Sequence, residues 1–182
     1  MDKTIRTHFD NIRSEDPQAQ NKAYYALIEK TDKPVDWAYE IWDELLDGLN
    51  HRDNHVRAIS SQVLVNLAKS DPKEKMLKDF GKLLEVTKDE KFVTARHCLQ
   101  SLWKVGVAGK KQQKVYIEGV EKRYKECVKE KNASLIRYDI LVSMKNVYNE
   151  VKDETIKEKA LALIETEKDV KYQKKYKTVW KE

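Results

Sequence analysis

The chain has 182 residues, of which 37% are charged and 40% hydrophobic, and its formal net charge is +5. A chain of this length can bury enough apolar surface to fold without disulfides or a structural metal. It contains neither an apolar run near the ~20 residues that a membrane span needs nor a signal-peptide pattern, so we expect a cytoplasmic protein without a membrane segment. Cys98 and Cys127 lie among apolar residues, which favours reduced thiols in the core.

The composition predicts an all-α protein. Only five glycines and three prolines are present, and no segment alternates apolar and polar residues as a half-buried strand would. Charge is distributed unevenly: residues 1–90 carry 14 Lys and Arg against 18 Asp and Glu, whereas residues 91–182 carry 22 against 13. The two halves therefore differ in sign, and a charged partner would distinguish them.

Apolar residues three and four apart predict a succession of amphipathic helices, separated by short breaks at Asp-Pro, Lys-Pro, Gly and Asn residues. In chain order the expected helices are residues 2–12, 17–31, 35–49, 53–67, 72–86, 89–106, 110–128 and 134–148. A closing segment, residues 153–182, ends in a basic tail. Because the breaks are short, neighbouring helices should pack antiparallel.

One helical pattern is written twice in the middle of the chain. Val56, Ile59, Val63 and Leu67 recur 36 residues later as Phe92, Ala95, Leu99 and Trp103. Weaker copies lie 37 residues earlier, around Ala23 and Leu27, and 80 residues later, at Ile136-Arg137. A fixed period of this length predicts repeated helix pairs that stack in one dimension.

The pattern Asp53, Val56-Arg57, Ser60, Val63-Leu64 and Leu67 resembles the second helix of HEAT or armadillo-type repeats. Degenerate copies span residues 16–28, 89–103 and 134–148, with Gln20 and Val93 at two of the arginine positions. The resemblance implies a right-handed α-α superhelix of about four HEAT-like hairpins plus a C-terminal capping helix. It predicts one domain, residues 1–182, with repeats at about 1–31, 35–69, 72–107 and 110–150 and a cap at 153–182.

The resemblance implies macromolecular binding and no reaction. The second helices of such a stack line a concave face, and their residues outside the apolar stripe would form a polar, mildly basic binding row. The predicted row comprises Arg57, Gln62, Asn66, Arg96, Gln100, Lys104, Arg137 and Lys145. We expect a non-enzymatic scaffold, monomeric or weakly self-associating, that holds an acidic or extended protein segment.

Other patterns favour structural roles, so we predict no catalytic residue, metal or cofactor. His51 and His55 have a zinc-like spacing, but the composition between them is that of a turn. His97 and Cys98 are adjacent on a helix and point ~100° apart, too far for a nucleophile and its base. Residues 106–111 have neither the spacing nor the preceding strand of a phosphate loop and read as a glycine-terminated helix.

The basic half carries the alternative function, nucleic-acid binding. Its tail combines lysines with an aromatic stripe: Lys171, Tyr172, Lys174, Lys175, Tyr176 and Trp180. These rings could stack on bases, or they could cap the last helix pair. HEAT-like alkylpurine DNA glycosylases use tryptophans and an aspartate in a basic groove, for which Trp37, Trp42 and Asp139 are the candidates here. Core packing is the competing interpretation of the tryptophans.

Overall fold

The computed structural model describes residues 1–181, and every regular element within that range is a helix. The all-α prediction is therefore confirmed. The α-helices are α1 (Lys3–Asn11), α2 (Pro17–Lys30), α3 (Ala38–Gly48), α4 (Asn54–Asn66), α5 (Lys75–Val86), α6 (Phe92–Ser101), α7 (Trp103–Gly106), α8 (Lys110–Glu126), α9 (Ala133–Val151), α10 (Glu154–Glu165) and α11 (Val170–Val179). Short 3-10 turns follow α4 at Leu67–Ser70 and α8 at Cys127–Lys129.

Aspartates define several helix starts. Asp2, Asp16, Asp53, Asp153 and Asp169 each stand at an N-cap and accept a hydrogen bond from a backbone N–H of the first turn. Such a cap satisfies a donor that has no partner inside the helix and typically contributes about 1 kcal/mol. Three of these residues precede helices that belong to one layer of the structure, α2, α4 and α11.

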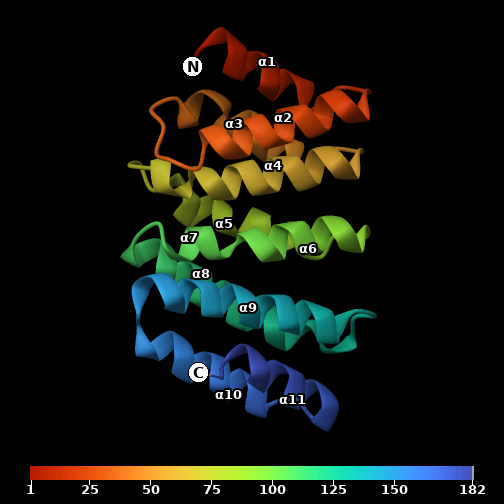
Figure 1. Cartoon of the computed structure of the whole chain (residues 1–182), viewed down its shortest axis with the longest axis vertical. Helices are drawn as coiled ribbons and strands as arrows, with labels where there is room; N and C mark the ends of the chain where they lie inside the picture. Colours follow the sequence, from red (N-terminus) through yellow and green to blue (C-terminus); the bar gives the residue numbers. More distant parts are fainter. Residues whose placement is uncertain (182) are drawn as a thin grey trace.

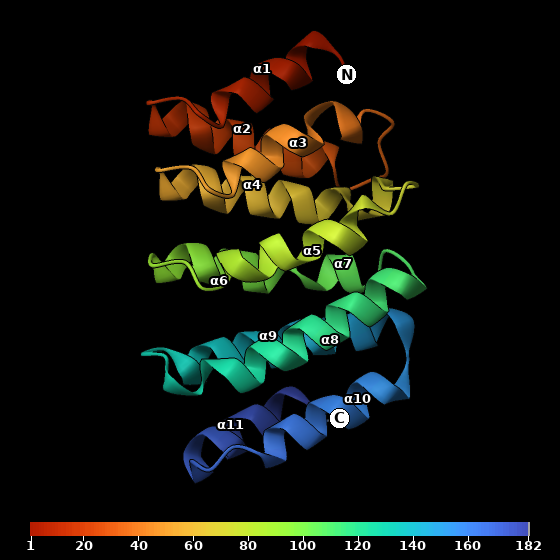
Figure 2. The ribbon, with the colours of Figure 1, turned by 180° about the vertical axis from the view of Figure 1, so that it is seen from behind.

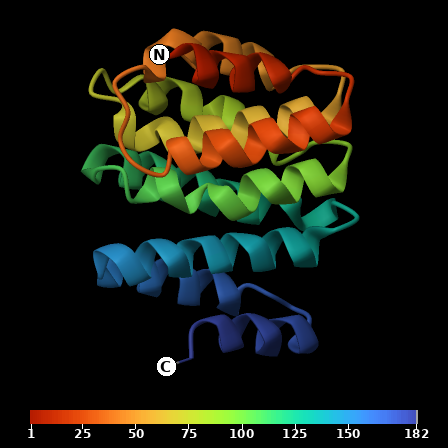
Figure 3. The ribbon, with the colours of Figure 1, turned by 45° about the horizontal axis from the view of Figure 1, so that its top comes forward.

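The helices are stacked in two layers along the long axis of the molecule. Helices α2, α4, α6 with α7, α9 and α11 follow one another in the layer nearer the viewer in Figure 1, and α1, α3, α5, α8 and α10 form the other layer, seen in front in Figure 2. The tilted view of Figure 3 shows α2, α4, α6 and α9 side by side. We call the outer surface of the α2 to α11 layer the second-helix face.

The repeated sequence pattern becomes a repeated spatial relationship. Helices α4 and α6, which come from the two clearest copies, pack directly against each other. Hydrogen bonds join positions about one period apart: the Tyr24 hydroxyl donates to Gln62, 38 residues on, and the Trp42 indole donates to Asp79, 37 residues on. Each helix pair therefore contacts mainly the pairs before and after it.

A continuous apolar core runs between the layers, from Phe9 through Trp42, Leu64 and Tyr116 to Tyr176. The backbone of α3 approaches α4 closely at Gly48, where an added Cβ would lie 2.9 Å from the Ser60 Cβ. A side chain larger than hydrogen at position 48 would force the two helices apart.

The structure differs from the expected elements in five places. The helix predicted at 35–49 begins at Ala38, since Lys33-Pro34 and Trp37 remain outside it. The helix predicted at 72–86 begins at Lys75, so Pro72 lies in the turn before it rather than in its first turn. The helix predicted at 89–106 is interrupted at Leu102, between α6 and α7, and its second part ends at Gly106 as expected. Val128, expected in the core, is 59% exposed because α8 ends at Glu126 and the chain turns. The closing segment is a helix pair, α10 and α11, rather than a single capping helix.

Candidate functional site on the second-helix face

The predicted row begins with Arg57 on α4, which is held by the next helix pair. Its guanidinium donates to both carboxylate oxygens of Asp89, at 2.5 and 2.8 Å, and to the His51 carbonyl at 2.8 Å. Both side chains are mostly buried, with 13% and 5% exposed. Burial alone would raise the pKa of Asp89, but the hydrogen bonds from Arg57 and the Lys91 N–H outweigh it and hold that pKa below its usual value.

The other two arginines of the row are paired in a related way. Arg96 on α6 donates to both oxygens of Asp139 on α9, at 2.7 and 2.9 Å. Arg137 on α9 donates to Glu167, before α11, at 2.8 Å, and its guanidinium carbon lies 4.7 Å from the centre of the Tyr124 ring. All three arginines therefore connect successive helix pairs through charge-assisted hydrogen bonds.

The residues at the arginine position of the repeated pattern, Gln20, Arg57 and Arg137, make the same kind of hydrogen bond. The acids Asp53, Asp89 and Glu167 each accept from the backbone N–H two residues ahead. Each also accepts from a side chain of the preceding second helix, namely Gln20, Arg57 and Arg137 respectively. We call this series the ladder.

Val93 interrupts the ladder. Valine cannot donate a hydrogen bond, and the Val93 side chain is 65% exposed on α6. In the loop before α9 the acid is Glu130, and it is held instead by Arg123 of α8, at 2.6 and 2.8 Å. At this repeat the second-helix face therefore presents an apolar side chain where the neighbouring repeats use a polar one.

Three other row residues also bond within the stack. Gln62 accepts from the Tyr24 hydroxyl, and the buried Asn66 donates to Thr31 Oγ1 at 3.1 Å. Lys104 donates to Asn66 Oδ1 at 2.6 Å. Burial, followed by the neighbouring charge of Lys69, lowers the pKa of Lys104.

The remaining two row residues are nearer the surface. Gln100 is exposed and donates weakly to Asp139, at 3.4 Å. Lys145 lies over the rings of Tyr148 and Trp180, with its Nζ 5.1 and 5.0 Å from their centres. Much of the predicted row therefore connects neighbouring helices of the layer.

A groove crosses the second-helix face near its amino-terminal end. It has a volume of about 490 Å³ and runs over α2, α4 and α6. Ala58 and Ile59 of α4, each 8% exposed, contribute to its lining between the flanking helices. Tyr25 on α2 is 63% exposed, and with Val93 it gives the groove two prominent apolar side chains.

The lining of this groove carries no Lys, Arg, Asp or Glu, in a chain that is 37% charged. Its polar groups are mainly amides, together with His55 and His97. The complete lining is Pro17, Gln18, Gln20, Asn21, Tyr24, Tyr25, Asn54, His55, Ala58, Ile59, Gln62, Val93, Thr94 and His97. Amide side chains both donate and accept hydrogen bonds, so they can pair with a peptide backbone.

Only Gln62 belongs to both the predicted row and the groove. The predicted row consists of polar residues outside the apolar stripe, so it contains neither Tyr25 nor Val93. Tyr24 and Tyr25 beside the stripe, and Val93 at an arginine position, were the sequence signals that could have indicated this groove.

The carboxy-terminal end of the face is basic. Lys171 and Lys175 lie one turn apart on the exposed side of α11, and the Lys175 Nζ lies 4.7 Å from the centre of the Tyr138 ring on α9. Lys174 is also exposed, and Tyr172 is half-buried. Tyr176 and Trp180 are buried, and the Tyr176 hydroxyl donates to the Ser134 carbonyl at 2.8 Å. These two rings pack on α9 and are not free to stack on bases.

The glycosylase candidates do not form a common site. Trp37 and Trp42 are buried in the first-helix layer, where the Trp42 indole donates to Asp79 at 3.0 Å. Asp139 is 3% exposed and paired with Arg96.

The cysteines and histidines are likewise dispersed. Cys98 is buried, which raises the pKa of its thiol to about 12, and burial also raises the pKa of Cys127. His51 Nδ1 accepts from the Asp53 N–H rather than facing His55. Within residues 1–181, His, Cys, Asp and Glu form no group of three that could hold a metal ion. No helix in that range combines the length and apolar content needed to cross a membrane.

The chain matches no protein-family model, and a search of curated proteins found none similar enough to count as a relative.

Proposed function

We propose that this protein is a HEAT-like α-solenoid, a right-handed superhelix of helical hairpins, that acts as a non-enzymatic cytoplasmic scaffold. It holds a partner protein on the second-helix face. Supporting the fold are the two stacked layers, the adjacency of α4 and α6, and the hydrogen bonds between positions one period apart. Two buried free thiols suit a reducing compartment.

The groove over α2, α4 and α6 is the observation that carries the binding proposal. Tyr25 and Val93 are bulky apolar groups at 63% and 65% exposure, on either side of an uncharged recess. Exposed apolar residues that cluster around a recess are typical of protein interaction sites, whereas singly scattered ones are common on any surface. Aromatic residues are also enriched among the side chains that contribute most to protein binding.

The paired arginines modify the chemistry expected of this face. Arg57, Arg96 and Arg137 already bind carboxylates of the stack, so their charges are neutralised locally. Changing all three arginines to glutamate would place a new carboxylate beside each of Asp89, Asp139 and Glu167. The repulsion would destabilise the fold, so a loss of partner binding could not be separated from a loss of stability. The groove residues offer a cleaner test.

The test compares two exposed valines. Val93→Glu places a charge in the groove, and Val128→Glu makes the same change at a residue that is 59% exposed and outside the groove. Affinity capture from an extract of the source organism, with quantitative mass spectrometry, should give a partner that is retained by the wild type and Val128→Glu and lost by Val93→Glu. Equal capture by all three proteins would contradict the proposal.

Nucleic-acid binding is the second candidate, favoured by Lys171, Lys174 and Lys175 on α11, which within residues 1–181 have no ion pair with a carboxylate. Unpaired lysines on one short helix can contact phosphates, and such binding weakens steeply with salt. A gel-shift assay with random duplex and single strands at low and moderate salt tests it. Absence of retardation at about 50 mM salt would remove this candidate.

A further inference from the structure

We infer that the segment bound on the second-helix face has two chemically distinct ends: bulky uncharged residues over α2, α4 and α6, and acidic residues over α9 and α11. This inference rests on the proposed function and specifies the chemistry of the partner. It depends on two observations that are independent of each other, the composition of the groove and the unpaired lysines.

The first observation fixes the chemistry of the uncharged end. An ionised side chain seated in the groove would lose water and find no opposite charge among the lining residues. Aliphatic or aromatic side chains would instead bury surface against Tyr25, Ile59 and Val93. The amides of Gln18, Asn21 and Asn54 on the groove lining can bond the peptide groups of an extended segment, since each offers both a donor and an acceptor.

The second observation fixes the chemistry of the acidic end. The three acids that precede α11 in the chain form no ion pair with Lys171 or Lys175: Glu167 holds Arg137, Glu165 pairs with Lys177, and Asp169 accepts from the Lys171 and Tyr172 N–H groups. Lys145 and Lys175 lie over aromatic rings and have no ion pair within residues 1–181. Lys171, Lys175 and Lys145, which we call the basic patch, therefore remain available to form ion pairs with carboxylates of a partner.

The path between the two ends is short and continuous. Helices α4, α6, α9 and α11 pack in sequence along the same layer. Packed helices lie about 8–10 Å apart, so α9 is roughly 18 Å and α11 roughly 27 Å from α4. An extended chain advances about 3.3 Å per residue, so roughly five to eight residues should separate the apolar anchor from the acidic cluster.

A peptide selection tests this composition directly. The full chain is immobilised and used to select from a phage-displayed library of random peptides, each about 16 residues long. The selected sequences should share an aromatic or aliphatic cluster separated by about five to eight residues from two or more Asp or Glu. A synthetic peptide of the consensus is then titrated by fluorescence anisotropy against the wild type and its variants.

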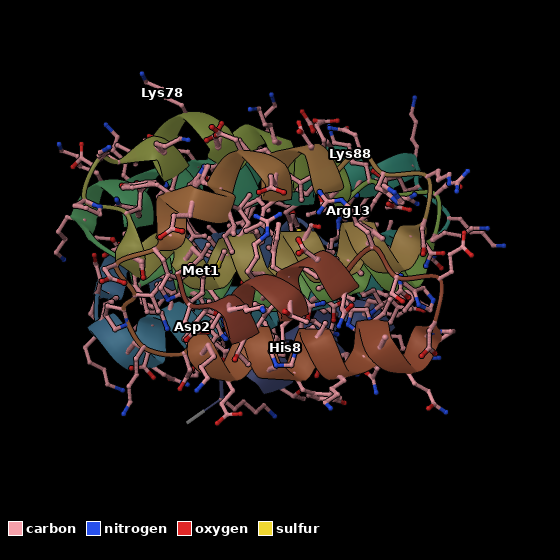
Figure 4. The ribbon with its side chains drawn as sticks, turned by 90° about the horizontal axis from the view of Figure 1, so that it is seen from above. Met1, Asp2, His8, Arg13, Lys78 and Lys88 are labelled. Atoms are coloured by element: carbon pink, nitrogen blue, oxygen red, sulfur yellow. The ribbon has the colours of Figure 1, made fainter. Side chains whose placement is uncertain are left out.

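Two matched pairs of variants separate the ends. Val93→Glu should lower the affinity for the peptide at least about tenfold, and Val128→Glu should leave it unchanged. The double change Lys171→Glu and Lys175→Glu should lower the affinity for the peptide about tenfold at low salt. In high salt the affinities of the wild type and this variant should become nearly equal. The control changes are Lys78→Glu with Lys114→Glu, both exposed in the first-helix layer; Lys78 projects from the side of the molecule opposite α2 (Figure 4).

The outcomes distinguish this inference from the proposed function. Selected peptides that depend on Val93 but lack acidic residues, or that bind the Lys171→Glu and Lys175→Glu protein unchanged, overturn the two-ended partner and leave the scaffold proposal standing. If no selected peptide binds the Val93→Glu protein more weakly than the wild type, both the two-ended partner and the scaffold proposal are contradicted. Binding of single-stranded nucleic acid that requires Lys171 and Lys175, with no effect of those lysines on peptides, assigns the basic patch to a different partner and also overturns the inference.

Discussion

The Asp89 carboxylate serves two structural purposes at once, since it accepts from the Lys91 N–H at the start of α6 and from the Arg57 guanidinium of the preceding repeat. Asp53 and Glu167 do the same in their own repeats. An acid at this position therefore sets the local chain direction and the contact between repeats together. This explains why Asp recurs just before the repeated helix.

Removing one member of this buried pair should be costly. Asp89→Ala leaves the Arg57 guanidinium mostly buried without its counter-charge, and we expect a loss of about 3 kcal/mol in the free energy of unfolding. The matched control is Asp43→Ala, which removes the partner of Lys75 from an exposed pair and should cost less than about 1 kcal/mol. Urea denaturation measures both, and similar losses for the two variants would contradict the buried role of Asp89.

The same pair predicts a specific pH dependence. Because the pKa of Asp89 is lowered on folding, its contribution is fully present above the ordinary aspartate pKa of about 4 and is lost as the pH falls through the folded value. Asp89→Asn should therefore show a shallower loss of stability between about pH 5 and pH 3 than the wild type. The pKa of Asp79 is also lowered, so the free energy of unfolding of the variant should still depend on pH, but less steeply than that of the wild type. Identical slopes would show that Asp89 does not titrate with folding.

At the scale of elements, close helix packing makes one glycine necessary and another dispensable. A Cβ at Gly48 would lie 2.9 Å from the Ser60 Cβ on α4 and still closer to its hydroxyl, whereas a Cβ at Gly81, inside α5, would have no other atom within 4 Å. Gly81→Ala should raise the free energy of unfolding by about 0.5–1 kcal/mol, since alanine is the better helix former. Gly48→Ala should lower it by about 1–3 kcal/mol. Thermal unfolding of the two variants tests this, and stabilisation by both would contradict the close contact of α3 with α4.

Helix content and repeat spacing were readable from the sequence because they depend on local patterns. Apolar residues three and four apart indicated each second helix, and Asp-Pro breaks or single Asp caps marked several starts. The interruption at Leu102 carries no glycine or proline, so nothing in the local pattern indicated it. The exposure of Val128 likewise depends on where α8 ends relative to α9.

The candidate site was less predictable because it depends on which side chains meet across repeats. The motif indicated that Arg57 and Arg137 face the second-helix layer, but not that Asp89 and Glu167 would neutralise them. The groove needs Tyr25, Ala58 and Val93 from three different helices. These three residues lie about 35 residues apart in the chain, so they meet only because the helices pack side by side, which the pattern of any single helix does not indicate.

For the molecule as a whole, helix pairs that pack mainly against the pairs before and after them should keep damage local. Tyr176 is buried on α9 through its ring and its bond to the Ser134 carbonyl. Tyr176→Ala should cost roughly 3–5 kcal/mol at that end, so amide hydrogen exchange should quicken in α9 to α11 and stay unchanged in α1 to α4. Val170→Ala, at a residue 63% exposed on the same helix, is the control. Uniformly faster exchange throughout the chain would show a single cooperative unit instead.

The central claim is that a partner segment lies along the second-helix face, and its most direct test is the binding footprint in solution. Backbone amide shifts in a nuclear magnetic resonance titration with the selected peptide should change along α2, α4, α6, α9 and α11 and remain unchanged on α1, α3, α5, α8 and α10. Changes centred on the first-helix layer, or confined to the loops at one edge of the stack, would contradict the account.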